Sequence, residues 1–421
     1  MDVDILVIAL SVLGFALLAG RLSGTPLTMP MLFTGAGLLL GGHGLGLVNI
    51  GVDSEAVSVL AEVTLVVVLF TDASRIHLGA VLRQHAVALR MLVVGMPLAM
   101  LLGTLVGVVL LPDLPLLTVA VLAVVLAPTD AALGQSFVTA EAVPQRVRQA
   151  LNVESGLNDG LALPFLLVLI DLSRAEASGV WHYLGLFVAM VGLGSLFGAV
   201  TGWLGGRVLT WSTERGWTTD TTQRLGTLAL AAVAYASAET VGGNGFVAAF
   251  VAGLTVGTTA RSLLKSTTIF AETEGQLLTL LTFLLFGAVV AGDLTELTWQ
   301  IAAYAALSLV AVRPLATAVA LVAARLSSRT VAFLGWAGPR GLASIVYAVL
   351  VVDVGGVPGA ETVLNVAAWT ILLSVLLHGL SAAPLSRLYG HYVDRSLPMN
   401  APERQEVTNL PVRLPPHRHR E

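Results

Sequence analysis

Residues Ala127-Pro128-Thr129-Asp130 and, further along, Glu154-Ser155-Gly156-Leu157-Asn158-Asp159-Gly160 interrupt an otherwise apolar part of the chain. Residues 116–126 before them and 161–170 after them are almost wholly apolar, as expected of membrane-spanning helices. Three carboxylates therefore lie at membrane depth. A charge there costs at least about 2.5–3.5 kcal/mol, so an intramembrane acid indicates function.

Composition places this stretch in a polytopic all-α membrane protein. Of 421 residues, 56% are hydrophobic and 11% charged, with mean hydropathy +0.86, whereas soluble domains carry roughly 25% charged residues. Without cysteine, disulfides and thiolate metal sites are excluded. Windows of about 20 apolar residues predict about thirteen spans: 5–20, 28–44, 56–71, 88–111, 116–138, 149–171, 181–205, 224–240, 246–258, 275–291, 298–324, 330–352 and 362–386. We expect one transmembrane domain over 1–396 and a disordered, basic cytoplasmic tail over 397–421.

The placement of lysine and arginine predicts the orientation of these spans. With the N-terminus outside, Arg174 is the one basic residue in an outside loop, and the other loop lysines and arginines face inward. This bias is the positive-inside pattern and predicts a cytoplasmic C-terminus. Arg313 and Arg340 remain, both inside spans.

Weak internal repeats relate the two halves of the chain. Phe33, Phe70 and Pro128 have counterparts at Phe250, Phe286 and Pro339, which lie 217, 216 and 211 residues later. A shift of seven spans turns the second copy over, which predicts inverted repeats. Pro128 and Pro339 each break a helix, since proline lacks an N–H and clashes with the preceding turn. We expect two broken helices that cross near the midplane, where transporters place their ion sites.

The sixth span predicts a polar face. At 100° per residue, Asn158, Ser155 and Asp159 lie about 40°, 100° and 140° from Glu154. Such a face points inward, and Gly156 and Gly160 allow a close neighbour, which we expect to be the break at Pro128. Hydroxyls, freed carbonyls and two carboxylates would then suit a dehydrated alkali cation better than a tight divalent site.

The buried Arg340 needs an anion, because arginine stays protonated. Glu154 is the expected partner. An alternative role exists at the break, where half-helix ends carry partial charges of about ±0.5. Asp130 could compensate the N-terminal ends and Arg340 the C-terminal ends. Arg313 is expected to fix a helix contact or to lie toward the inner surface. Glu62 and Glu239 are expected to be boundary or packing acids.

These motifs resemble the monovalent cation/proton antiporters, in particular the sodium/proton exchanger (NhaP-like) branch, with Asn158-Asp159 where electrogenic relatives have two aspartates. Gly242-Gly243-Asn244-Gly245-Phe246 and Gly338-Pro339-Arg340-Gly341 extend the resemblance. It implies a homodimer in the lipid bilayer, with a mobile core and elevator-like alternating access. It also implies that Asp159 binds cation and proton, that Thr129, Asp130, Ser155 and Asn158 support it, and that Glu154 pairs with Arg340. Near Asp72 the sequence departs from the family pattern.

The expected function is electroneutral exchange of Na+, Li+ or K+ for H+, without a cofactor and without nucleic acid. Thr129, Asp130, Ser155 and Asp159 are the expected cation ligands. A K+/H+ antiporter or a regulated K+ efflux pathway is the alternative. An intramembrane enzyme is disfavoured, because the sequence has no His-Glu-x-x-His pair and no clear protease signature.

Overall fold

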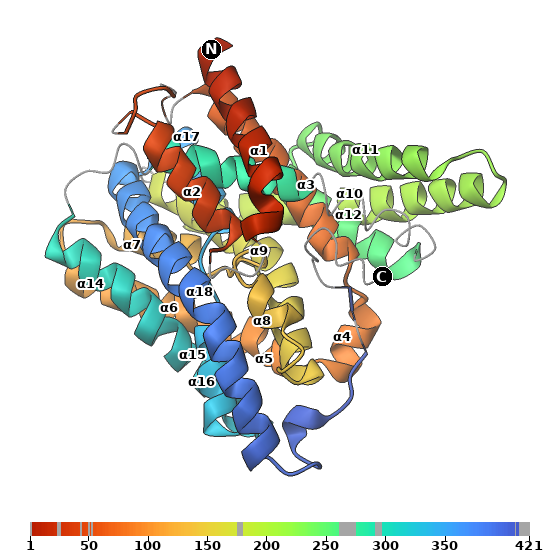
Figure 1. Cartoon of the computed structure of the whole chain (residues 1–421). Helices are drawn as coiled ribbons and strands as arrows, with labels where there is room; N and C mark the ends of the chain where they lie inside the picture. The colour runs from red at the N-terminus through yellow and green to blue at the C-terminus, as the bar shows by residue number, and fades with distance from the viewer. Residues whose placement is uncertain are drawn as a thin grey trace.

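The computed structural model describes residues 2–22, 27–42, 44–48, 51, 54–174, 180–260, 275–290, 297–408 and 410–411. Helices joined by loops, without strands, make up this part of the chain (Figure 1). Within it, six helices are long and apolar enough to cross a membrane, at Glu55–Ser74, Ala86–Leu110, Gln145–Arg174, Phe187–Glu214, Trp299–Ala324 and Ala360–Ser396. The protein is therefore an all-helical, multi-pass membrane protein.

The labelled elements follow in chain order. They are α1 (Asp2–Leu22), α2 (Met29–Leu40), α3 (Glu55–Ser74), α4 (Leu78–Gln84), α5 (Ala86–Arg90), η1 (Met91–Gly95), α6 (Met96–Leu110), α7 (Leu116–Val125), α8 (Gln135–Thr139), α9 (Gln145–Arg174), α10 (Val180–Glu214), α11 (Asp220–Glu239), α12 (Gly245–Thr259), η2 (Phe286–Val290), α14 (Trp299–Leu307), η3 (Ser308–Val312), α15 (Arg313–Leu321), η4 (Val322–Ala324), α16 (Ser328–Trp336), α17 (Leu342–Asp353), α18 (Ala360–Ser396) and η5 (Pro402–Arg404).

Helices α10, α11 and α12 pack together on one side of the molecule, with α14, α15 and α16 on the other (Figure 1). Helix α12 also packs against α3, and Gly253 and Gly257 bring its backbone against Phe70 and Ser74 so closely that a Cβ would clash. Two glycines at the C-terminal end of α2 make a matching contact. Gly37 and Gly41 lie against the backbone of Leu284 and Ala288, again with no space for a side chain.

Two π-helical segments have the same form. Each is five residues long, Met91–Gly95 and Ser308–Val312, and their first residues are 217 positions apart (91 to 308). In both cases proline is the second residue of the next helix, Pro97 or Pro314. Proline has no N–H to donate to the turn before it, and π segments inside helices are frequent at functional sites. Helix α15 packs against η1 and α6 packs against η3, so each irregular segment lies beside the helix that follows the other.

The glycine-rich turn between α11 and α12 is a helix cap. The Asn244 side chain accepts a hydrogen bond from the N–H of Val247, and Glu239 Oε1 accepts one from the N–H of Gly245 at 2.7 Å. Gly242 has φ +76°, which glycine adopts without strain. Glu239 is thus a boundary acid, as predicted.

The segment after α18 folds back onto the bundle. Three amides on one face of α9 hold it, with hydrogen bonds that join Gln145 to Val407, Gln149 to Leu410 and Asn152 to Pro411. Glu403, 1% exposed, accepts from the N–H of Ser327 at 2.7 Å and from the Thr330 hydroxyl at 3.0 Å. These contacts correct the prediction of disorder for residues 397–408 and 410–411. The rest of the predicted tail lies outside the described residues.

We expect Glu403→Ala to loosen this segment, because an unpaired buried donor costs about 1–3 kcal/mol. Amide hydrogen exchange over residues 397–411 should then be faster than in the wild type. Glu406→Ala is the matched control, since Glu406 carries the same charge but is exposed. The same exchange rate in both variants would contradict the contact's role.

Candidate ion-binding site

The fifth and twelfth predicted spans are both broken. Helix α7 ends at Val125 and the chain is non-helical before α8, while residues 337–341 separate α16 from α17. The Asp130 N–H donates to the Pro339 carbonyl at 2.8 Å, so the two unwound segments cross. Both predicted breaks, at Pro128 and Pro339, are present, and the two unwound segments are in contact.

The Asp130 carboxylate binds backbone N–H groups of both broken segments. Its Oδ1 accepts from the N–H groups of Ala132 at 2.6 Å and Leu133 at 2.9 Å, and its Oδ2 from the N–H of Leu342 at 2.5 Å. Leu342 is the first residue of α17. Asp130 is 5% exposed, and its carboxylate faces the positive N-terminal end of α17. This is the compensating role that the sequence left open beside ion binding.

Arg340 supplies the opposite charge. It is 1% exposed, and its Nη1 donates to the carbonyl of Gly338 at 3.0 Å, just past the C-terminal end of α16. Its own N–H donates to Ser374 Oγ at 2.7 Å. The guanidinium thus lies where the free carbonyls of a half-helix concentrate negative partial charge.

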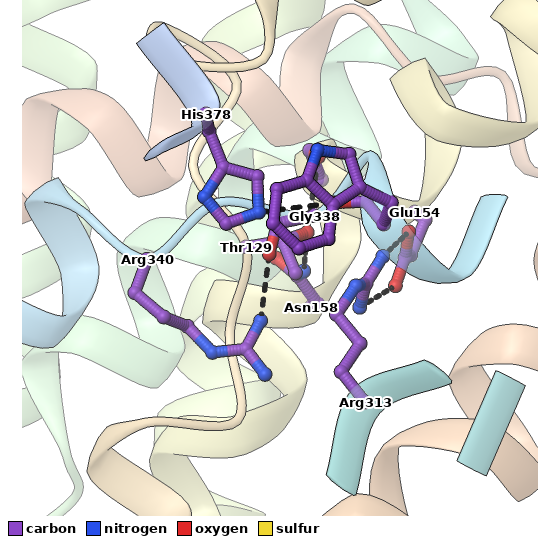
Figure 2. Close-up of polar contacts among 9 residues, drawn as sticks. Thr129, Glu154, Asn158, Arg313, Gly338, Arg340 and His378 are labelled. Atoms are coloured by element: carbon purple, nitrogen blue, oxygen red, sulfur yellow. Dashed lines mark hydrogen bonds and ion pairs between the residues drawn. The ribbon is translucent and has the colours of Figure 1, made fainter. Parts of the chain in front are cut away.

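Glu154 pairs with Arg313, which corrects the predicted pair with Arg340. Arg313 Nη1 and Nη2 donate to the two carboxylate oxygens of Glu154, each at 2.8 Å, and Figure 2 shows this fork apart from the Arg340 guanidinium. Both side chains are at least nine-tenths buried. A planar fork matched to a carboxylate is the strong form of this contact. Arg340 is instead held by the end of α16.

Gly338 makes this arrangement possible. A Cβ at residue 338 would overlap the Arg313 guanidinium, so only glycine leaves the arginine room beside the crossing. Gly341 has a similar role, since a Cβ there would overlap the Asp130 carboxylate. Arg313 was not predicted from the sequence as the partner of Glu154. One feature of the sequence could have pointed to Arg313. The pair Arg313-Pro314 lies 217 residues after Met96-Pro97, at the spacing of the internal repeat, and its proline indicates an irregular helix there.

A buried polar cluster joins the first break to α9. Thr129 Oγ1 lies 3.1 Å from Ser155 Oγ, and Asn158 Nδ2 donates to Thr129 Oγ1 at 2.6 Å. Thr129 is 1% exposed, Ser155 9% and Asn158 2%. Small cavities of about 10 Å³ each lie on two sides, one beside Ser155 and the other beside Asn158 and Arg313. Each has room for about one water-sized particle.

Asp159 follows Asn158 on α9, about 100° further around the helix, and is half-buried. Its carbonyl accepts a hydrogen bond at 2.6 Å from the hydroxyl of Tyr347, a fully buried residue of α17. The structure thus brings Thr129, Ser155 and Asn158 together and ties the Asp159 turn to the second broken helix. In the described part of the chain, no three residues among His, Asp and Glu gather as a metal site.

The neighbours of the α9 glycines differ from the prediction. Gly156 faces Ile76 just after α3, and Gly160 faces the ring of Phe250 on α12. The break lies instead against the Ser155 and Asn158 side of the helix. Glycine removes bulk where whole helices meet, whereas polar side chains meet the unwound backbone.

Comparison with known proteins gives a consistent result. The family model described as "Sodium/hydrogen exchanger, transmembrane" matches residues 6–388. The K+/H+ antiporter NhaP of Alkalimonas amylolytica is 24% identical over 405 residues, 92% of this chain and 67% of that protein. The K+/H+ antiporter NhaP2 of Shewanella sp. (strain ANA-3) is 28% identical over 264 residues, 62% of this chain and 45% of that protein. This chain therefore spans about two thirds of the first relative and less than half of the second.

The fold also has a solved counterpart. The structure of the sodium proton antiporter MjNhaP1 from Methanocaldococcus jannaschii at pH 8 matches with a TM-score of 0.72 at 20% identity, covering 90% of this chain and 96% of that one. At this identity the match shows the fold. The family model, which covers most of the sequence, shows that the chain belongs to the transmembrane sodium/hydrogen exchanger family.

Proposed function

We propose that this protein is a secondary transporter, rather than an enzyme, that exchanges a monovalent cation for a proton. The observation that carries the proposal is the crossing of two unwound segments, whose helix ends are compensated by Asp130 and Arg340, beside a polar cluster on α9. Unwound backbone at membrane depth is tolerated where it lines a cavity or is buried in protein. Transporters place ion sites at such breaks.

The proposed cation ligands are Asp159, the Thr129 and Ser155 hydroxyls and the Asn158 amide oxygen. That amide oxygen is buried and accepts no hydrogen bond from the described part of the chain, which leaves it available to a cation. Asp130 was also an expected ligand. Its three backbone donors favour the helix-capping role, so we place it next to the bound cation rather than on it.

Asp159 is the proposed carrier of both ions. Glu154 is neutralised by Arg313, and the Asn158 amide is not a titratable group. One carboxylate is then left to cycle. Moving a bare carboxylate through a low-dielectric barrier is disfavoured, so the site crosses loaded with either a cation or a proton. Exchange is then electroneutral, at about one cation per proton.

The architecture we propose has about thirteen spans in inverted repeats. The two π segments, each with its proline, support the repeat, as do the paired glycine contacts of α2 and α12 and the two breaks. The N-terminus is proposed outside and the C-terminus in the cytoplasm of a cell membrane. The family resemblance further favours a homodimer.

The cation is Na+ in our main proposal and K+ in the alternative. The relatives named above are called K+/H+ antiporters, while the matching solved structure is of a sodium proton antiporter. Proteoliposomes loaded with an acid-quenched dye decide between them: dequenching on addition of Na+, K+ or Li+ gives the preference order. Cation flux without proton movement would instead indicate a K+ efflux pathway and contradict exchange.

A further inference from the structure

A groove runs between α16 and α18, away from the ion site. It encloses about 540 Å³ and is lined by Ala332, Phe333, Trp336, Leu385, Leu388, Tyr389, Tyr392 and Arg329. All of these except Arg329 are apolar or aromatic. The positions recur at intervals of three or four on both helices, so one face of each helix forms a wall.

The floor of the groove is aromatic and buried, and its rim is exposed. Phe333 and Tyr389 stack at 4.3 Å between ring centroids and are 7% and 5% exposed. Tyr389 is further held by the Thr330 hydroxyl at 2.9 Å. Leu388 on the rim is 68% exposed. A preformed apolar trough of this kind matches a flexible hydrocarbon chain.

Positive charge marks one end of the groove. Arg329 lies one residue after the start of α16, and its guanidinium carbon lies 4.5 Å from the centre of the Tyr392 ring. Arg395 follows Tyr392 by three residues on α18, so it lies on the same side, and it is exposed. The guanidinium fork is well suited to phosphate oxygens.

Charge and apolar surface are ordered along the groove as they are along a phospholipid. Arg329 and Trp336 are about 10 Å apart along the axis of α16. Arg329 lies near the start of this helix, and Trp336 lies at the unwound segment that follows it. We propose that the groove binds one anionic phospholipid, with its phosphate at Arg329 and an acyl chain along Phe333 toward Trp336. This site is separate from the proposed exchange function and does not depend on it.

The inner end of the groove touches the second break. Trp336 is the last residue of α16 and residue 337 begins the unwound segment. Its ring stacks on His378 at 4.7 Å, and its Nε1 donates to Ser381 at 2.9 Å. A lipid bound along α16 therefore supports the short half-helix that ends at the crossing. Because a ligand stabilises the state that binds it, the lipid raises the unfolding temperature.

The test is thermal unfolding of the full chain in detergent with dioleoyl phosphatidylglycerol or dioleoyl phosphatidylcholine added. We expect the first lipid to raise the unfolding temperature well above the second in the wild type, and Arg329→Gln to lose most of that difference. Arg215→Gln is the matched control. Arg215 is also exposed, and its guanidinium carbon lies 4.2 Å from the ring centre of Trp211, a residue of α10. It should keep the wild-type difference.

A second variant separates the contribution of the apolar groove to lipid binding from that of the Arg329 charge. Leu388→Trp fills the groove and leaves Arg329 in place, and it too should lose the shift. Native mass spectrometry should count one fewer tightly held phosphatidylglycerol in both variants. An equal shift with inorganic phosphate, an equal shift with phosphatidylcholine, or an undiminished shift in Leu388→Trp would overturn the proposal. A change in oligomeric state in Leu388→Trp would point instead to a second copy in the groove and would also overturn it.

Discussion

Asp159→Asn is expected to abolish cation/proton exchange in proteoliposomes while leaving the fold intact. Asparagine keeps the shape of the side chain and can accept a hydrogen bond, but it neither exchanges a proton nor carries charge to hold a cation. The second buried acid of α9 does not replace it, because Glu154 is engaged by both terminal nitrogens of Arg313. The measurement is the rate of dye dequenching after a cation pulse, beside the thermal unfolding curve of each protein.

Asp171→Asn is the matched control for this variant. Asp171 lies on the same helix, is also half-buried, and lies twelve residues beyond Asp159 (159 to 171). It makes the same chemical change away from the crossing, so exchange should stay close to the wild-type rate. Exchange that survives in Asp159→Asn would refute the proposal that one carboxylate carries both ions.

Arg313→Ala is expected to lower the stability of the protein by about 3–5 kcal/mol, because it leaves the Glu154 charge buried without a partner. Adding Glu154→Ala should restore part of the loss, since the uncompensated charge is then gone. Thermal or denaturant unfolding in detergent, arranged as a double-mutant cycle, measures the coupling between the two residues.

The same cycle with Arg340 tests the corrected assignment. Arg340 donates to Gly338 and makes no hydrogen bond to Glu154, so its coupling to Glu154 should be weaker than that of Arg313. Strictly additive losses for Glu154 and Arg313 would contradict the ion pair. A stronger coupling to Arg340 would restore the pairing expected from the sequence.

The crossing of the two breaks was predictable from the sequence because it depends on backbone chemistry. Pro128 and Pro339 lie in apolar spans at related positions, and a proline removes a helical hydrogen bond wherever it is placed. The inward polar face of α9 followed in the same way from helical periodicity. Both predictions concern features that one residue or one helix determines.

The partner of Glu154 was not predictable in this way. Two arginines lay at membrane depth, and the choice between them depends on side-chain reach and on the space that Gly338 leaves. Sequence spacing contains neither quantity. The ordered segment after α18 was missed because its composition is polar and rich in proline. A signal existed in Gln145, Gln149 and Asn152, three amides on one face of α9 that need partners.

The central claim is that cation and proton compete for Asp159, and the pH dependence of the half-saturating Na+ concentration tests it most directly. In proteoliposomes, this concentration should rise about tenfold for each unit by which the pH falls, within the acidic range in which protons occupy the site. Each unit adds about 1.36 kcal/mol of competing proton binding. The maximal rate should change much less. A half-saturating concentration that stays constant with pH, while the maximal rate falls, would contradict competition at a single carboxylate.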